Sequence, residues 1–230
     1  MIKIISLHDL RDNYIRLIHN EKNALVIDPG QAEQVLSYLY EKNLVLREIW
    51  LTHHHSDHIG GVDELRKNFP DIKIFGAKSI ACVNNPVIDG MTDGIFSMLT
   101  IKTAGHTQDG HSYLLNSDNQ QHLFCGDILF SAGCGRVFEG TTDDLRLSLK
   151  KIAQFPDDTL LYPAHEYTHN NLLFAHSIEP DDDDIASALQ NLPAVTLPTS
   201  IGRERKINLF LRYVDDAQKF ADLRRRKDEF

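Results

Sequence analysis

Short apolar runs alternate with amphipathic stretches over the first two thirds of the chain. Two helix-period segments, at 32–39 and 62–69, lie between strand-like runs, and a third covers about 145–153. The segment 76–93 has no clear period and is expected to be a loop. The pattern therefore predicts an α/β protein of the α+β type. Strands are expected at 2–7, 14–19, 24–27, 49–51, 72–75, 96–103, 112–115, 122–125 and 160–162.

The pattern changes after about residue 165. Strand-like runs disappear, and helix-period segments follow at about 168–177, 184–190 and 215–226. We therefore expect a strand-rich domain at 1–165 and a small helical domain at 166–230. The acidic run 181–184 has two interpretations, a calcium-like patch or a solvated loop that begins a helix, and the second is favoured because acidic side chains suit a helix N-terminus.

Composition restricts the class of protein. The chain has 230 residues, 42% hydrophobic and 25% charged, which suits a soluble globular protein. Its formal charge of −9 argues against nonspecific nucleic-acid binding. The three cysteines are widely spaced and form no Cys-x-x-Cys pair, so no disulfide framework is expected. No apolar run predicts a membrane span, and the first residues turn polar too early for a secretion signal, so we expect a cytoplasmic protein.

A histidine-rich segment, Thr52–His58, follows the strand expected at 49–51. His53, His55 and Asp57 occupy alternate positions, so in an extended chain their side chains project to one side. His58 breaks the alternation and must point elsewhere once the chain turns. Imidazole nitrogens and carboxylate oxygens are ligands that zinc accepts. A solvated histidine-rich turn or a tag is the alternative, but the segment is internal and contains a carboxylate, so a metal site is favoured.

Three more candidate ligands each follow an apolar run. They are His106, Asp127 and His165. Singly, each would be read as a turn residue, but strand ends are where open sheets place functional groups. Together with the histidine-rich segment they predict two metal ions with Asp127 shared, since a carboxylate has two oxygens. The expected sets are His53, His55 and His106 for one metal, and Asp57, His58 and His165 for the other.

Two further histidines near these ligands are expected to have secondary roles. His54 points to the face opposite its neighbours, so a supporting role is expected. His111 either orients a ligand or is a plain hairpin residue.

These motifs carry a resemblance to a known family. His-x-His-x-Asp-His at 53–58, Gly-His-Thr at 105–107, Gly-Asp at 126–127 and the late His165 are similar to the metallo-β-lactamase-fold hydrolases. Further segments resemble the glyoxalase II family, the hydroxyacylglutathione hydrolases, and this resemblance runs from residue 12 to residue 230. The segments that carry it are Asp12-Asn13-Tyr14, 125–130, 133–141, 164–168 and 224–230.

The resemblance implies a fold, a reaction and a set of contacts. The fold is an αββα metallo-β-lactamase sandwich with a small helical C-terminal domain. The reaction is hydrolysis of S-D-lactoylglutathione, and of related S-2-hydroxyacylglutathiones, to D-lactate and glutathione. The cofactor is a pair of divalent ions, expected to be Zn²⁺, with iron and manganese as alternatives. A hydroxide held between the metals is the expected nucleophile, so no side chain takes that role. The metal ligands fall on the seven residues already named.

The same resemblance places the substrate contacts at Arg136, Tyr167, Arg224 and Lys227. The partner is then a small glutathione thioester, with no nucleic acid or membrane, and we expect a monomer. By spacing alone, Arg224 and Lys227 share a helical face, where they would also complement a helix C-terminus.

Two other functions stay open at this point. One is another metallo-β-lactamase-fold enzyme, such as an iron persulfide dioxygenase, a broader thioesterase or a lactonase. The other is a metal-binding protein without catalysis. The chain departs from the glyoxalase II pattern at Phe138, where some members have tyrosine, at Ile128, where threonine is usual, and by one extra residue between His106 and His111. The helical C-terminal part and the late His-Glu-Tyr-Thr favour the thioester hydrolase.

Overall fold

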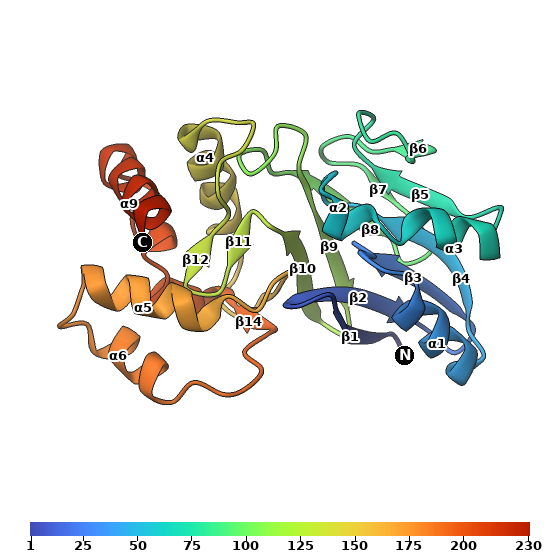
Figure 1. The fold of residues 1–230 in the computed structure, drawn as a ribbon, viewed down its shortest axis with the longest axis horizontal. Coiled ribbons are helices and arrows are strands. Elements are labelled where there is room, and N and C mark those ends of the chain that lie inside the picture. The colour runs from blue at the N-terminus through green and yellow to red at the C-terminus, as the bar shows by residue number, and fades with distance from the viewer. The chain divides into compact units, whose positions relative to one another are not determined.

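The computed structural model describes residues 1–230, and the chain divides into two compact units. Unit 1 contains residues 1–102 and 111–119, and unit 2 contains residues 103–110 and 120–230. Figure 1 shows the elements of both. None of the helices combines the length and the apolar character needed to cross a membrane.

Unit 1 is built on a six-stranded sheet in the order β1 to β6. β1, β2 and β3 are antiparallel, and β3 to β6 are parallel. α1 and α3 connect the parallel strands, and Val35 and Leu39 of α1 pack with the strand residues in one hydrophobic core. The bounds are β1 Lys3–Asp9, β2 Asn13–His19, β3 Asn23–Ile27, α1 Glu33–Lys42, β4 Val45–Trp50, α2 Ser56–Ile59, α3 Val62–Asn68, β5 Lys73–Gly76 and β6 Asn85–Pro86.

The parallel pairing of β3 with β4 decides where the candidate ligands lie. Parallel strands end at the same edge of a sheet, so the segment after β3 and the segment after β4 become neighbours. The backbone amide of Asp28, just after β3, donates to the carbonyl of Trp50 at 3.0 Å. Asp28 has a positive φ of 52°, which aspartate tolerates better than most residues. This turn directs the Asp28 side chain toward the histidine-rich segment.

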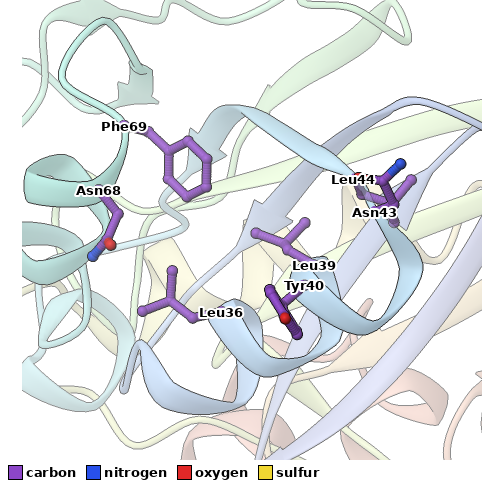
Figure 2. Close-up of a pocket in the computed structure, with 7 residues that line it drawn as sticks. All are labelled: Leu36, Leu39, Tyr40, Asn43, Leu44, Asn68 and Phe69. Atoms are coloured by element: carbon purple, nitrogen blue, oxygen red, sulfur yellow. The ribbon is translucent and has the colours of Figure 1, made fainter.

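A shallow hollow lies at the other end of β4 (Figure 2). Its volume is about 430 Å³, and its lining includes Leu36, Leu39, Leu44 and Phe69. Tyr40 stands at its margin with 91% of its surface exposed. Because Leu44 directly precedes β4 and the histidines follow it, the hollow is separate from the histidine-rich segment.

Unit 1 also contains three antiparallel strands, β7 (Thr92–Asp93), β8 (Met98–Lys102) and β9 (His111–Ser117). They pack over the end of β4 through buried polar contacts. Tyr113 donates its hydroxyl to the carbonyl of Leu51 at 2.6 Å, and Glu48 accepts from the Ile95 backbone amide at 2.9 Å. Burial raises the pKa of Glu48. These contacts fix the strand that carries the histidines.

Unit 2 combines short strands with most of the helices. β10 pairs in parallel with β13, β14 pairs antiparallel to β13, and β11 and β12 form a small hairpin. α4 begins at a capping box in which Thr141 and Asp144 satisfy each other's backbone amides. The bounds are β10 Gln120–Gly126, β11 Leu129–Phe130, β12 Gly133–Cys134, α4 Thr142–Ile152, β13 Leu160–Pro163, α5 Thr168–Ile178, α6 Asp183–Gln190, β14 Thr199–Ser200, α7 Ile201–Ile207, α8 Leu209–Arg212 and α9 Ala217–Glu229.

The β11–β12 hairpin is tied to the C-terminal helices by a buried carboxylate. Glu204 of α7 accepts from the Ser131 hydroxyl at 2.8 Å and from the Ala132 amide at 2.7 Å. Asn208 donates to Glu204 at 3.1 Å and to the carbonyl of Gly133 at 2.9 Å. Burial raises the pKa of Glu204. A satisfied polar network of this kind holds the hairpin in one position.

The expected regular elements are confirmed, with bounds that shift by a few residues. The helix-start interpretation of the acidic run is also confirmed. Asp182 is the N-cap of α6, with its carboxylate accepting from the Ile185 amide at 2.9 Å. The hydrogen bond from Arg212 lowers the pKa of Asp182. Two helices, α7 and α8, and the short α2, β6, β7, β11, β12 and β14 were not predicted, because each is too short to show a period. β6 and β7 lie in the segment 76–93, which was expected to be a loop.

Candidate metal centre

The histidine-rich segment changes conformation at His55. His55 is extended and is the N-cap of α2, so Asp57 and His58 lie in the first helical turn. The expected alternation therefore applies to His53 and His55 but not to Asp57. The turn depends on Gly60, because a Cβ there would lie only 2.6 Å from the Gly30 carbonyl oxygen.

The orientation of His53 is set by a chain of hydrogen bonds that ends at Asp28. The Thr52 hydroxyl donates to Asp28 Oδ2 at 2.6 Å and lies 3.0 Å from His53 Nδ1. The hydroxyl has one hydrogen, which it gives to the carboxylate, so it must accept from His53 Nδ1. That assignment leaves the lone pair of His53 on Nε2, and His53 Nε2 faces His55 Nδ1 at 3.0 Å.

Asp28 also contacts another candidate ligand, His58, directly. Its Oδ2 lies 3.0 Å from His58 Nδ1, which favours a proton on that nitrogen. His58 Nε2 then faces Asp57 Oδ2 at 3.6 Å. Asn13 donates its amide to the same Asp57 oxygen at 3.1 Å. One buried carboxylate thus orients two imidazoles, and one amide orients the neighbouring carboxylate.

These four side chains fit a bound cation. The Asp57 oxygen accepts, and the nitrogen of His58 that faces it carries a lone pair, so the two repel each other unless a positive charge lies between them. Tetrahedral zinc with Zn–N distances of about 2.0–2.1 Å separates two ligand nitrogens by roughly 3.3 Å. The 3.0 Å between His53 Nε2 and His55 Nδ1 and the 3.6 Å between His58 Nε2 and Asp57 Oδ2 lie on either side of that value.

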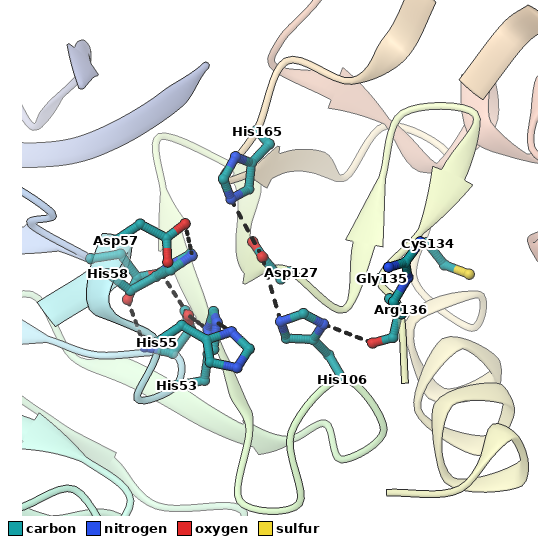
Figure 3. A network of polar contacts seen from close by, with 12 residues as sticks. His53, His55, Asp57, His58, His106, Asp127, Cys134, Gly135, Arg136 and His165 are labelled. Carbon is teal, nitrogen blue, oxygen red and sulfur yellow. Dashed lines mark hydrogen bonds and ion pairs between the residues drawn. The ribbon is translucent and has the colours of Figure 1, made fainter. Parts of the chain in front are cut away.

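Unit 2 holds a second group of donors, His106, Asp127 and His165. Asp127 Oδ2 lies 3.5 Å from His106 Nε2 and 3.4 Å from His165 Nε2, as the dashed lines in Figure 3 show. His106 Nδ1 lies 2.8 Å from the Arg136 carbonyl oxygen, which accepts its proton. Its Nε2 lone pair therefore also faces a carboxylate oxygen, and this group fits a cation for the same reason.

Close backbone approaches place these ligands. Gly105 has a φ of 135°, and a Cβ there would lie 2.4 Å from the Leu145 Cα. A Cβ on Gly135 would lie 2.0 Å from the Asp127 carbonyl oxygen. The glycines before His106 and Arg136 thus allow the two segments to approach closely enough for the Arg136 carbonyl to reach His106.

The four expected substrate residues differ in their surroundings. Arg136 is exposed, and Tyr167 stacks on His165 with an interplanar angle of 9°. Lys227 is half-buried between Phe174 and Phe230, whose ring centroids lie 4.9 and 5.0 Å from its nitrogen. Burial, and then the nearby charge of Arg224, lower the pKa of Lys227 to about 8. The fourth residue, Arg224, is buried and donates to backbone carbonyls.

Sequence reasoning missed the residues that orient the ligands. In the sequence, Asp28 only follows the strand expected at 24–27, Thr52 only begins the histidine-rich segment, and Asn13 only belongs to the Asp12-Asn13-Tyr14 motif. The available signal for Asp28 was its position directly after an expected strand, where open sheets place functional groups. His111 places its backbone on the site, since its amide donates to the Thr52 carbonyl at 2.9 Å.

Comparisons with known proteins agree with this geometry. Residues 10–79 and 83–165 match the model of the metallo-beta-lactamase superfamily. ETHE1 from Myxococcus xanthus superposes with a TM-score of 0.70, is 28% identical, and covers 93% of this chain and 90% of its own. The BLEG-1 B3 metallo-beta-lactamase gives a TM-score of 0.69 at 25% identity, covering 92% and 99%. The fold is thus that of a metallo-β-lactamase-superfamily protein, and its donor groups indicate divalent metal ions.

More specific matches narrow the class. Residues 166–230 match the model of the hydroxyacylglutathione hydrolase C-terminus. The hydroxyacylglutathione hydrolases of Aliivibrio salmonicida (strain LFI1238) and Yersinia pestis (strain Pestoides F) are each 42% identical, with the whole of both chains covered. The chain belongs to the hydroxyacylglutathione hydrolase family. The expected fold class and the resemblance to glyoxalase II are both confirmed.

Proposed function

We propose that this protein hydrolyses S-D-lactoylglutathione and related S-2-hydroxyacylglutathiones to the free 2-hydroxy acid and glutathione. The full-length similarity to hydroxyacylglutathione hydrolases is the observation that supports this most strongly. The thioester is a suitable substrate because its leaving group is a thiolate, and a thiol has a pKa of only about 8.5. The enzyme therefore needs no strong general acid.

The proposed cofactor is a pair of zinc ions. We assign His53, His55 and His106 to one ion, Asp57, His58 and His165 to the other, and Asp127 to both. The support is the lone-pair geometry of each donor group taken separately. When bound, two such ions lower the pKa of a shared water toward about 7 and provide hydroxide at neutral pH. No side chain is proposed as the nucleophile.

The protein's own residues hold the ligands and the substrate. Asp28 fixes the tautomers of His53, through Thr52, and of His58. Asp127 brings His106 and His165 to one carboxylate. We propose that Arg136, Arg224 and Lys227 attract the glutathione carboxylates, because the chain is acidic overall and the attraction must be local. Tyr167, stacked on His165, lies where it can contact the bound thioester.

The proposed organisation follows the sequence boundary. Residues 1–165 form the catalytic domain, and residues 166–230 form the substrate-binding domain, which is the part that matches the family's C-terminal model. We propose a cytoplasmic monomer acting on a small molecule.

Hydrolysis of S-D-lactoylglutathione by metal-replete protein tests the proposal. Loss of the ultraviolet absorbance of the thioester, together with two zinc ions per chain, is the expected result. Full metal loading without hydrolysis would refute the proposal. One iron per chain with oxygen uptake on a glutathione persulfide would instead favour the dioxygenase.

A further inference from the structure

Asp228 of α9 links two arginines that lie about ninety residues apart in sequence. Its Oδ1 accepts from Arg136 Nε at 3.2 Å and from Arg224 Nη2 at 3.0 Å. Both contacts lie within unit 2. One carboxylate oxygen therefore holds an arginine of the loop after β12 and an arginine of the last helix at once.

Arg224 is the fixed end of this link. Its side chain is 6% exposed, and its Nη1 donates to the carbonyls of Cys134 at 3.1 Å and Gly135 at 3.2 Å. Its guanidinium also lies 5.3 Å from the Phe210 ring centroid. A buried guanidinium with these partners has little freedom to turn toward a ligand, so Arg224 serves as an anchor for β12 and for Asp228.

Arg136 is the exposed partner of Asp228. Its side chain is 58% exposed, and Nε is the atom that Asp228 holds. Its Nη1 and Nη2 make no hydrogen bond within the protein, so both remain available for a bidentate contact with a carboxylate. Its backbone carbonyl accepts from His106 at 2.8 Å. The residue is thus placed at its backbone by a candidate metal ligand and at its side chain by Asp228.

We propose that Asp228 is a positioning residue for substrate recognition. It holds the Arg136 guanidinium so that both terminal nitrogens face a carboxylate of the glutathione moiety, while Arg224 supports Asp228. An exposed arginine otherwise samples many rotamers, and pre-ordering it removes that cost from binding. The charges of Arg136, Arg224 and Lys227 outweigh that of Asp228, so the group stays attractive to an anion. This inference rests on the proposed function.

The test compares Asp228→Asn with Asp222→Asn. Asp222 lies on the same helix and pairs with an arginine, Arg225, that contacts Asp222 and Glu229 only. Asp228→Asn is expected to raise KM for S-lactoylglutathione about three- to fivefold, the effect of losing one exposed charged contact, with kcat unchanged. Asp222→Asn is expected to leave KM unchanged, and Asp228→Glu to restore part of the loss.

A binding measurement separates this inference from the proposed function. Calorimetry with S-hexylglutathione, a thioether that cannot be hydrolysed, should show the same three- to fivefold weakening in Asp228→Asn. Arg136→Ala should also weaken binding, and adding Asp228→Asn to it should produce no further loss. S-lactoyl-N-acetylcysteamine, which lacks the glutathione carboxylates, should be hydrolysed equally by wild type and Asp228→Asn.

Three outcomes would overturn the positioning role. They are unchanged S-hexylglutathione affinity in Asp228→Asn, full additivity with Arg136→Ala, and an equal loss on the truncated thioester. A wild type that binds S-hexylglutathione but hydrolyses no glutathione thioester would refute the proposed function and leave the calorimetric test of Asp228 decisive.

Discussion

Replacing Asp28 with asparagine should weaken the binding of both metal ions. The Asp28 carboxylate accepts from the Thr52 amide at 2.8 Å and from the Thr52 hydroxyl at 2.6 Å, and it contacts His58 Nδ1 at 3.0 Å. An asparagine oxygen can keep the first contact. Its NH₂ group would then face the Thr52 hydroxyl hydrogen and the proton on His58 Nδ1. Two of the three contacts become donor against donor, and the tautomers of His53 and His58 are no longer fixed.

The size of the effect follows from the role of each histidine. Loss of the group that orients a metal-bound histidine typically lowers metal affinity about 10- to 100-fold. Because Asp28 orients one proposed ligand of each ion, both affinities should fall by about that factor. Thr52→Val removes only the path to His53, so it should weaken one ion and spare the other.

Zinc titration of metal-free protein against a fluorescent chelator measures both affinities. Thermal unfolding of the same samples without metal shows whether each variant is folded. A folded Asp28→Asn protein that binds two zinc ions as tightly as wild type would refute the tautomer argument. If Asp28→Asn does not fold, Thr52→Val still tests the argument. Two unchanged zinc affinities in Thr52→Val would contradict the path from Asp28 to His53.

Two further substitutions test the second donor group and the substrate site. Asp127→Ala should abolish zinc binding and thioester hydrolysis together, because both His106 and His165 face its Oδ2. The control is Asp109→Ala, a change at an exposed aspartate. Activity retained by Asp127→Ala would contradict the shared ligand. Burial and Arg224 lower the pKa of Lys227 to about 8, so its positive charge is present below pH 8 and is lost above it. KM for S-lactoylglutathione should therefore rise above pH 8 in wild type, and Lys227→Ala should show a raised KM at pH 7 without that later rise. A KM that is independent of pH in wild type would contradict the role of Lys227.

The strands, the longer helices and the candidate ligands could be predicted because each has a local signal. Apolar alternation and helical period mark β2, α1 and α4, and His53, His106 and Asp127 each stand just after an apolar run. β2 is buried on both faces, and Arg16 is the one charged residue within its apolar run. These features depend on a few neighbouring residues, which a single sequence displays directly.

The orienting residues could not be predicted because their partners are distant in sequence. Asp28 acts on Thr52 only because β3 and β4 pair in parallel, and the sequence does not state that pairing. Arg224 shows the same limit. Its spacing from Lys227 predicted a shared helical face, but the face toward Cys134 is buried while Lys227 remains half-exposed. The helical period gives the direction in which a side chain points, whereas its burial depends on packing against the rest of the fold.

The position of Arg136 explains why the helical C-terminal segment matters for more than substrate contact. Arg224 and Asp228 of α9 hold Gly135 and the Arg136 side chain, and the Arg136 carbonyl holds His106 Nδ1. Glu204 and Asn208 hold the β11–β12 hairpin from its other side. C-terminal helices therefore fix both ends of the segment that carries Arg136. This segment in turn positions His106, a proposed metal ligand. Within unit 2, substrate recognition and ligand orientation depend on the same few backbone atoms, so a change that displaces these atoms should alter both.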